Sequence, residues 1–362
     1  MVPPAGPRAA RTPPRPHDAS QLRPRGRGDL VRDGRAQAEH RQLPRRRAPH
    51  QRGRLATRLL IRQRAHSSFP RRRQSRIPSP LPQERATRFS AWVRVALYSA
   101  LAHPKEAPVR VPVKDGEVEV IEQGSGDLVV CVSSLGRGIE DFDALAQDLE
   151  AAGYRVAGVN HRGVGDSSPA VDGLTLRDFA DDVARAIEHV GGAPAHLIGH
   201  AFGNRIVRCL ASDRPDLTRS VTLIAPGGQA PPAPDIPPTL MRIFELDRPA
   251  EDRLADVQRV FFSPGRDASI WLDGWFPATR KMQWDARDSV PYAEWGHAGS
   301  APVLAIQGLD DPMATPENGY VLRDQLGADR VEVVDLPDAS HALLPEQPEA
   351  ITHEVLAFLA KH

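Results

Sequence analysis

From Val109 onward, short apolar runs alternate with longer amphipathic stretches, and this alternation constrains the fold of the chain more than any other feature. The apolar runs have the length of strands, and the stretches between them repeat apolar residues at helical spacing. Such alternation builds βαβ units, so we expect an α/β fold: a doubly wound, mostly parallel sheet with helices on both faces. The expected strands are 109–113, 117–124, 127–134, 154–160, 195–199, 220–227, 301–308 and 330–337, and the expected helices are 142–153, 176–192, 202–215 and 351–362.

Residues 228–300 interrupt this rhythm. The proline-rich stretch 229–239 is expected to be a loop, and the stretches 244–262, 268–276 and 278–289, which carry most of the Trp and several Phe residues, are expected to be helical. In a doubly wound sheet, an insertion that follows the carboxyl end of a strand sits where ligands bind. We therefore expect a helical cap, or lid, at about 228–300.

Residues 1–88 differ in composition from the rest of the chain. They hold 23 Arg, no Lys and 5 acidic residues, together with 13 of the 35 prolines. The segment has very few periodic apolar residues, and their burial cannot offset the entropy lost on ordering the chain. We therefore predict that it is disordered. It could be a basic arm for nucleic acid, an organelle transit peptide, or sequence upstream of the true start. We favour the last, because no recognisable binding module accompanies the arginines.

An amphipathic helix is predicted over 89–104, ending at His103-Pro104. It could dock on the following domain or lie on a membrane surface; docking is favoured because Arg94 is the only basic residue on its polar face. The sequence has no run of 18 apolar residues and no leader pattern, so no membrane span and a cytoplasmic location are expected.

The two cysteines, Cys131 and Cys209, have no metal-binding spacing and are expected to be core residues. No metal cluster, phosphate loop or complete cofactor fingerprint is found, so neither a metal nor a cofactor is expected. In particular, Gly163 and Gly165 lack the third glycine of a dinucleotide-binding motif.

Residues 197–207, LIGHAFGNRIV, have the pattern of a strand, a sharp turn and a helix. Gly199 and Gly203 fit a strained turn whose helix packs close to the sheet. The residue between them would be a nucleophile in a hydrolase, but it is Ala201, whose methyl group cannot attack a substrate.

This turn and three further motifs lie along the chain in the order found in α/β-hydrolases. The stretch 109–362 therefore resembles an α/β-hydrolase with a helical cap, and this resemblance implies an eight-stranded sheet. By this resemblance Ala201 takes the nucleophile position, Asp311 is the triad acid and His341 is the triad histidine. Asp310 is the rival acid, and Asp311 is preferred because its spacing from Gly308 and Pro312 fits better.

The resemblance also implies an oxyanion hole made by the backbone N–H groups of Leu135 and Phe202. The loop that carries Leu135 departs from the family pattern, because Ser133 and Ser134 precede it where His-Gly is usual. Either serine could be a substitute polar group at the site, or could simply bond within its own loop. The loop 160–167, NHRGVGDS, resembles a family loop of structural role.

Three hypotheses about function follow from Ala201. In the first, the chain is an enzyme in which His341, oriented by Asp311, acts as a general base on a small ester or carbonyl compound without a covalent intermediate. In the second, it is an inactive protein that binds a small apolar ligand. In the third, it is a serine hydrolase inactivated by a Ser-to-Ala substitution. The intact Asp and His favour the first, and the partner in each case is a small molecule.

Overall fold

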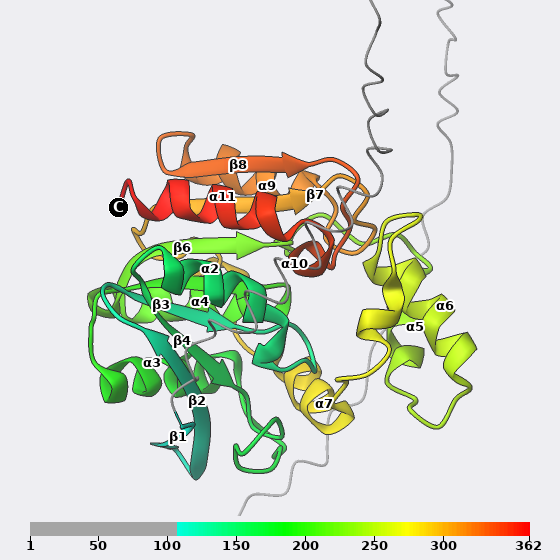
Figure 1. Cartoon of the computed structure of the whole chain (residues 1–362), viewed down its shortest axis with the longest axis horizontal. Coiled ribbons are helices and arrows are strands. Elements are labelled where there is room, and N and C mark those ends of the chain that lie inside the picture. Colours follow the sequence, from blue (N-terminus) through cyan, green and yellow to red (C-terminus); the bar gives the residue numbers. More distant parts are fainter. Residues whose placement is uncertain (1–106) are drawn as a thin grey trace, which may run out of the picture. The chain divides into compact units, whose positions relative to one another are not determined.

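The computed structural model describes residues 107–362, and the predicted disorder of 1–88 and helix of 89–104 lie outside this range. Eight strands form one sheet in the order β1-β2-β4-β3-β5-β6-β7-β8. The first two strands of this order pair antiparallel with their neighbours, and all the others pair parallel (Figure 1). The strands are β1 (Val109–Val113), β2 (Gly116–Gly124), β3 (Leu128–Val132), β4 (Arg155–Asn160), β5 (Ala195–His200), β6 (Thr218–Ile224), β7 (Val303–Gly308) and β8 (Val331–Leu336). The prediction of a mostly parallel, eight-stranded sheet is confirmed.

Burial explains why these strands could be recognised. Every residue of β3, β5 and β7 is buried, which is what a central parallel strand covered by helices on both faces requires. The hairpin between β1 and β2 turns at Asp115, whose φ of 56° is a conformation that Asp tolerates in tight turns.

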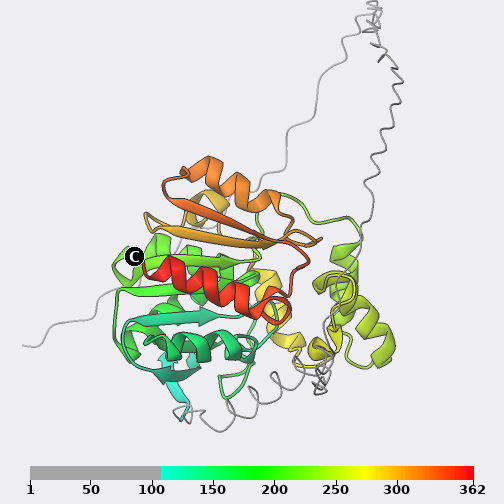
Figure 2. The same cartoon turned by 45° about the horizontal axis from the view of Figure 1, so that its top comes forward.

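Helices cover both faces of the sheet (Figures 1 and 2). On one face, α3 (Leu176–Val190), α4 (Phe202–Asp213) and α9 (Glu317–Leu326) contribute to one apolar core, which includes both Phe179 and Leu322. On the other face, α2 (Asp143–Ala151) and α11 (Pro348–Leu359) contribute to a second core, which includes Leu149 and Phe358. The short elements around them are η1 (Ile139–Phe142), η2 (Pro215–Leu217) and α10 (Leu343–Glu346).

The segment between β6 and β7 is helical and lies off the carboxyl ends of the strands (Figures 1 and 2). It holds α5 (Ile236–Ile243), α6 (Ala250–Phe261), η3 (Ala268–Trp271), α7 (Pro277–Ala286) and α8 (Tyr292–Trp295). Most of its aromatic side chains form a third apolar cluster with Ile236 and Leu240, and that cluster reaches Ala342. Trp295 of α8 belongs instead to the core that includes Phe179. Core packing therefore accounts for most of these aromatic residues.

Three expectations for this segment are wrong in detail. The expected loop 229–239 overlaps α5, because Pro237 falls in the first turn of the helix, where a missing N–H costs nothing. The expected helix 244–262 begins only at Ala250, after Pro249 has ended the preceding turn. The expected helix 268–276 is a single 3-10 turn, η3, followed by irregular chain through Gly274, whose φ is 80°.

A buried cation fastens this segment to the sheet domain. Arg137 Nε lies 2.9 Å from Asp141 Oδ2, and Arg137 Nη1 donates to the Asp273 carbonyl at 2.7 Å. The same guanidinium lies 4.5 Å from the ring centroid of Trp271 and 4.6 Å from that of Trp275. Ion pairing and cation–π contact together hold the insertion against the loop that follows β3.

Both cysteines are buried in the core, as expected, and burial raises the pKa of each thiol to about 12. Within residues 107–362, no helix combines the length and the hydropathy that crossing a bilayer requires.

Candidate functional site

The turn between β5 and α4 has a strained backbone at its centre. Ala201 has φ 50° and ψ −105°, a combination that residues with a Cβ rarely adopt. Its N–H donates to the Ile224 carbonyl at 3.0 Å, and its carbonyl accepts from the Asn204 N–H at 3.1 Å. The turn is therefore held between the helix it starts and the end of β6, and it points residue 201 away from the sheet.

Two glycines allow α4 to start so close to the sheet. A Cβ on Gly199 would lie 2.6 Å from the carbonyl carbon of Gly203, and a Cβ on Gly203 would collide with the Val132 carbonyl oxygen. These are approaches that only glycine permits. The sequence pattern G-x-A-x-G therefore corresponds to a physical requirement at both glycines.

Asp311 and His341 form a buried pair at the ends of neighbouring strands. Their side chains are fully and almost fully buried, and His341 Nδ1 lies 2.7 Å from Asp311 Oδ2. The other carboxylate oxygen of Asp311 accepts from the Met313 and Ala314 N–H groups at 2.8 and 2.9 Å. Asp310 has an exposed side chain, and its N–H donates to the Ala339 carbonyl at 2.9 Å, so Asp311 and not Asp310 is the partner of the ring.

This pairing determines which imidazole nitrogen is basic. The carboxylate of Asp311 is a hydrogen-bond acceptor, so the proton lies on Nδ1 of His341 and the lone pair lies on Nε2. Nε2 is buried and has no hydrogen-bond partner among the described residues. A buried acceptor without a partner is costly, which is typical of a group that meets its partner only when a ligand binds.

A second histidine supports the first from behind. His200 Nε2 lies 2.8 Å from the His341 carbonyl oxygen, so Nε2 of His200 is the donor in that bond. Burial and, to a smaller extent, the neighbouring His341 lower the pKa of His200 to about 3, so His200 is neutral. Sequence reasoning assigned no role to His200. Its place on a strand that is buried throughout was the available signal, because a buried imidazole needs a partner.

The loop of His341 is also anchored by a buried carboxylate. Glu346 accepts from the Ser340 N–H and from the Ser263 N–H, both at 2.6 Å. Ser340 precedes His341, and Ser263 follows α6. One side chain therefore ties the histidine loop to the helical insertion, and burial raises its pKa.

The two serines of the loop after β3 have different surroundings. Ser133 is buried and its hydroxyl donates to the Arg137 carbonyl at 2.9 Å, so it serves its own loop. Ser134 and Leu135 instead line a cavity. The next amide, Gly136 N–H, donates to Gln283 Oε1 of α7 at 2.7 Å, which fixes the loop beneath the insertion.

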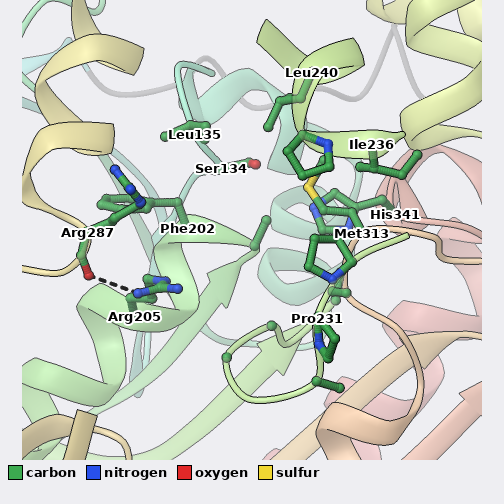
Figure 3. Close-up of a pocket in the computed structure, with 18 of the residues that line it drawn as sticks. Ser134, Leu135, Phe202, Arg205, Pro231, Ile236, Leu240, Arg287, Met313 and His341 are labelled. Carbon is green, nitrogen blue, oxygen red and sulfur yellow. Dashed lines mark hydrogen bonds between the residues drawn. The ribbon is translucent and has the colours of Figure 1, made fainter. Parts of the chain in front are cut away.

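The cavity has a volume of about 340 Å³ and lies between the sheet domain and the helical insertion (Figure 3). Of the residues singled out from the sequence, those that line it are Ser134, Leu135, Ala201, Phe202 and His341. Asp311 stands behind His341, and Ser133 does not line the cavity. The volume falls within the range of small-molecule sites.

Comparison with known proteins agrees with this architecture. The family model for the alpha/beta hydrolase fold matches residues 127–268. The chain is 30% identical over 258 residues to the protein named "Putative carbamate hydrolase RutD" of Azorhizobium caulinodans, covering 65% of this chain and 92% of that one. The chain belongs to the α/β-hydrolase family.

Other relatives of this α/β-hydrolase carry different names. It is 28% identical over 261 residues to "Putative non-heme bromoperoxidase BpoC" of Mycobacterium tuberculosis, covering 66% of this chain and 96% of that one. The crystal structure of the same relative matches with a TM-score of 0.59 and 25% identity, covering 69% and 97%. An enol-lactonase from Burkholderia xenovorans shares the fold, with a TM-score of 0.59 at 22% identity, covering 70% and 100%. These relatives place the chain among hydrolase-type enzymes at a coarse level.

The loop 160–167 of this α/β-hydrolase has a structural role and does not line the cavity. Asn160 Oδ1 accepts from the Ile139 N–H at 2.9 Å, and its amide donates to Glu119 at 2.8 Å. Arg162 makes a buried two-point contact with Asp182, at 3.0 and 2.9 Å. Among the described residues, no group of His, Cys, Asp and Glu side chains is arranged to hold a metal ion.

Proposed function

We propose that this α/β-hydrolase is an enzyme that acts on a small ester or carbonyl compound, with His341 as general base and no covalent intermediate. The observation that carries the proposal is the buried, unpartnered Nε2 of His341, which lines the same cavity as the methyl group of Ala201. A base held by Asp311 can take a proton from water or from the substrate itself.

Two backbone N–H groups are proposed to stabilise the negative charge that develops on the substrate oxygen. Phe202 is the first residue of α4, so its N–H has no partner within the helix and carries the positive end of the helix dipole. Leu135 supplies the second N–H from the loop after β3. Both residues line the cavity beside Ala201. Donors of this kind contribute about 3 kcal/mol each to transition-state stabilisation.

Ala201 decides the class of mechanism. A methyl group forms no acyl-enzyme, and it leaves space for a water molecule or a substrate hydroxyl near His341. The reactions open to this arrangement are non-covalent hydrolysis, elimination, isomerisation and cyclisation. The helical insertion is proposed to act as a lid, because its residues Ile236, Leu240 and Trp284 line the cavity and would exclude water.

The names of relatives support the substrate class. Two of these names, carbamate hydrolase and enol-lactonase, refer to a carbamate and a lactone, which both contain a carbonyl group. We infer that the present protein takes a compound with a comparable carbonyl group, and that Ala201 changes how the carbonyl is attacked.

The test is a screen of the purified protein and its His341→Ala variant against esters, lactones and epoxides. We expect turnover by the unmodified protein and a loss of at least about a hundredfold in the variant, because the base is removed. His353→Ala is the matched control, since His353 is exposed on α11 and does not line the cavity. Turnover that survives His341→Ala would contradict the proposal.

The Ala201→Ser variant tests the geometry independently. If Ala201 takes the nucleophile position, a serine there lies beside His341 and hydrolyses short p-nitrophenyl esters with a burst of nitrophenol. A folded Ala201→Ser protein with neither burst nor turnover would show that the base and the residue 201 side chain are not in register.

A second candidate function is ligand binding without catalysis, which the missing nucleophile favours. A ligand recovered by mass spectrometry, bound equally well by His341→Ala and converted by neither form, would establish that function instead.

A further inference from the structure

The charged groups that line the cavity are of one sign. They are Arg205 of α4 and Arg287, which follows α7, and among the residues that the structure describes no Asp or Glu lines the cavity. The remaining lining is apolar side chains, glycine and a few uncharged polar groups. Two guanidinium groups that share one exposed carboxylate outside the lining, Asp288, give the cavity a net positive potential, which a negatively charged ligand would neutralise.

Arg205 is the more confined of the two. Its side chain is 26% exposed, and its Nη1 donates to the backbone carbonyl of Arg287 at 2.9 Å. The carboxylate that lies nearest is Asp288, 3.8 Å away and itself 69% exposed. Nε and Nη2 of Arg205 have no hydrogen-bond partner among the described residues. Burial lowers the pKa of Arg205, Asp288 opposes this effect, and the neighbouring Arg208 and Arg287 add to it.

Arg287 is held in place by the helix that it ends. Its guanidinium stacks on the Trp284 ring at 4.2 Å from the ring centroid, and its Nη1 donates to the Trp284 carbonyl at 2.6 Å. Its Nε lies 3.0 Å from Asp288, the same exposed carboxylate that is nearest to Arg205. Stacking and hydrogen bonding orient the planar fork before any ligand arrives.

A third guanidinium lies behind these two. Arg208, one turn after Arg205 on α4, is almost fully buried, and no carboxylate within residues 107–362 pairs with it. It donates to the Gly296 carbonyl at 2.9 Å and to the Tyr292 hydroxyl at 2.6 Å, and burial lowers its pKa. Its Nη1 lies 3.7 Å from where a Cβ on Gly228, a cavity residue, would stand. At this end of the cavity, Arg205 and Arg287 therefore share one exposed carboxylate, Asp288, and Arg208 adds a third positive charge.

Figure 3 shows where this cationic end lies relative to the proposed base. Arg205 and Arg287 lie together on one side of the close-up, and His341, Ile236 and Met313 lie on the other side. Ala201 and Phe202 line the same cavity. A ligand that reached both ends would carry its reacting group near His341 and its charge near the arginines.

We propose that the substrate bears a carboxylate, separate from its reacting carbonyl, which binds to Arg205 and Arg287. This deepens, and rests on, the proposed function, because it names the substrate class of the same cavity. A carboxylate is chosen because its two oxygens match the planar N–H fork of a guanidinium. If the arginines were purely structural, Arg205 would serve only to bond the Arg287 carbonyl, and the cavity would not distinguish charged from neutral ligands.

The first experiment measures binding, and it does not depend on catalysis. Isothermal titration compares hexanoate with hexanamide, which has nearly the same shape without the charge. We expect hexanoate to bind at least about tenfold more tightly to the unmodified protein, and the Arg205→Met and Arg287→Met variants to lose this preference. Arg185→Met is the control, because Arg185 is exposed on α3 and pairs with Asp181 there.

The results that overturn the proposal are definite. They are an absence of hexanoate binding, equal binding of the two probes, or a preference that survives in the folded Arg205→Met/Arg287→Met double variant. Far-ultraviolet circular dichroism establishes folding for each variant. Arg287, which is 35% exposed, gives a variant that is expected to fold even if Arg205→Met does not.

The second experiment separates this proposal from the proposed function. The Ala201→Ser variant is assayed on p-nitrophenyl hemiglutarate, which carries a distal carboxylate, and on neutral p-nitrophenyl butyrate. We expect kcat/KM to be at least about tenfold higher for the anionic ester, with the difference residing mainly in KM and lost in Arg205→Met. Equal rates on the two esters would overturn the carboxylate proposal and leave the catalytic one standing. Hexanoate binding without turnover of either ester would support the carboxylate proposal and contradict the catalytic one.

Discussion

Ala201 occupies a backbone conformation that its own side chain disfavours. Its φ of 50° brings Cβ toward backbone atoms, and two backbone hydrogen bonds of the turn, together with the packing of α4, hold it there. In a turn built for a nucleophile, the strain serves to present the side chain. Here the strain persists although the side chain is a methyl group.

Replacing Ala201 by glycine is expected to stabilise the protein. Glycine adopts φ 50° without a Cβ clash, and this gain exceeds the extra entropy that glycine gives the unfolded chain, for a net of about 1 kcal/mol. The measurement is urea unfolding of Ala201→Gly against the unmodified protein. Ala186→Gly, in the middle of α3, should instead lower the free energy of unfolding by about 1 kcal/mol. A decrease for Ala201→Gly as well would contradict the argument from strain.

At the scale of elements, the contact between α4 and β3 decides where residue 201 stands. The helix starts directly after β5 and crosses the end of β3 with backbone in contact with backbone, because Gly203 lies on the Val132 and Ser133 carbonyl oxygens. No side chain separates the two elements there. The position of the Phe202 N–H, and so of the proposed oxyanion hole, follows from this approach.

Gly203→Ala is expected to push α4 away from the sheet. An alanine favours a helix interior, but its Cβ would lie within 2.8 Å of the Ser133 carbonyl oxygen, so we expect a loss of about 1–3 kcal/mol in the free energy of unfolding. Gly227→Ala is the control, because its added Cβ would meet only Ala314 Cβ at an ordinary 3.8 Å. Thermal and urea unfolding measure both. Equal stability of the two variants would contradict a required close approach.

At the scale of the whole molecule, three buried histidines make stability depend on pH. Burial is the first cause that lowers the pKa of His161 and of His196 to about 4, and that of His200 to about 3. In the unfolded chain their pKa is near 6.5, so below that pH the unfolded state binds protons that the folded state excludes. Their contribution to stability is complete above pH 6.5 and is lost as the pH falls toward 4 and then 3.

As the pH falls through that window, we expect each of these histidines to reduce the free energy of unfolding by up to about 1.4 kcal/mol per pH unit. The measurement is urea unfolding at several pH values between 7 and 5 (roughly spanning the unfolded pKa). His196→Gln isolates one histidine from the carboxylates that titrate in the same range, since His196 lies on β5 beside Ser220 and outside the cavity. Its stability should fall less steeply with pH; an identical slope would contradict the assignment.

Two tertiary contacts integrate the molecule around the cavity. Arg137 joins the loop after β3 to Trp271 and Trp275 of the insertion, and Glu346 joins the insertion to the loop of His341. Both are buried charged groups whose partners come from distant parts of the chain. They fix the positions of the two walls of the cavity relative to each other.

The sequence by itself determined the elements and the positions where chemistry could occur. Alternating apolar runs reported the strands, because a central strand must be apolar on both faces, and two glycines marked the turn at Ala201. By resemblance to the α/β-hydrolases, the order of motifs predicted that Asp311 pairs with His341. These are local signals, which a few neighbouring residues can carry.

Only the tertiary structure decided what surrounds those positions. The proline-rich sequence around Ile236 did not predict a helix. This helix is stabilised by the burial of Ile236 and Leu240 in the insertion and not by local helix propensity. The hydrogen bond from His200 spans 141 residues, and the one between Arg205 and Arg287 spans 82. No local pattern encodes contacts at such separations, because they depend on how the whole sheet and its insertion pack; the cationic end of the cavity is therefore a property of the folded chain.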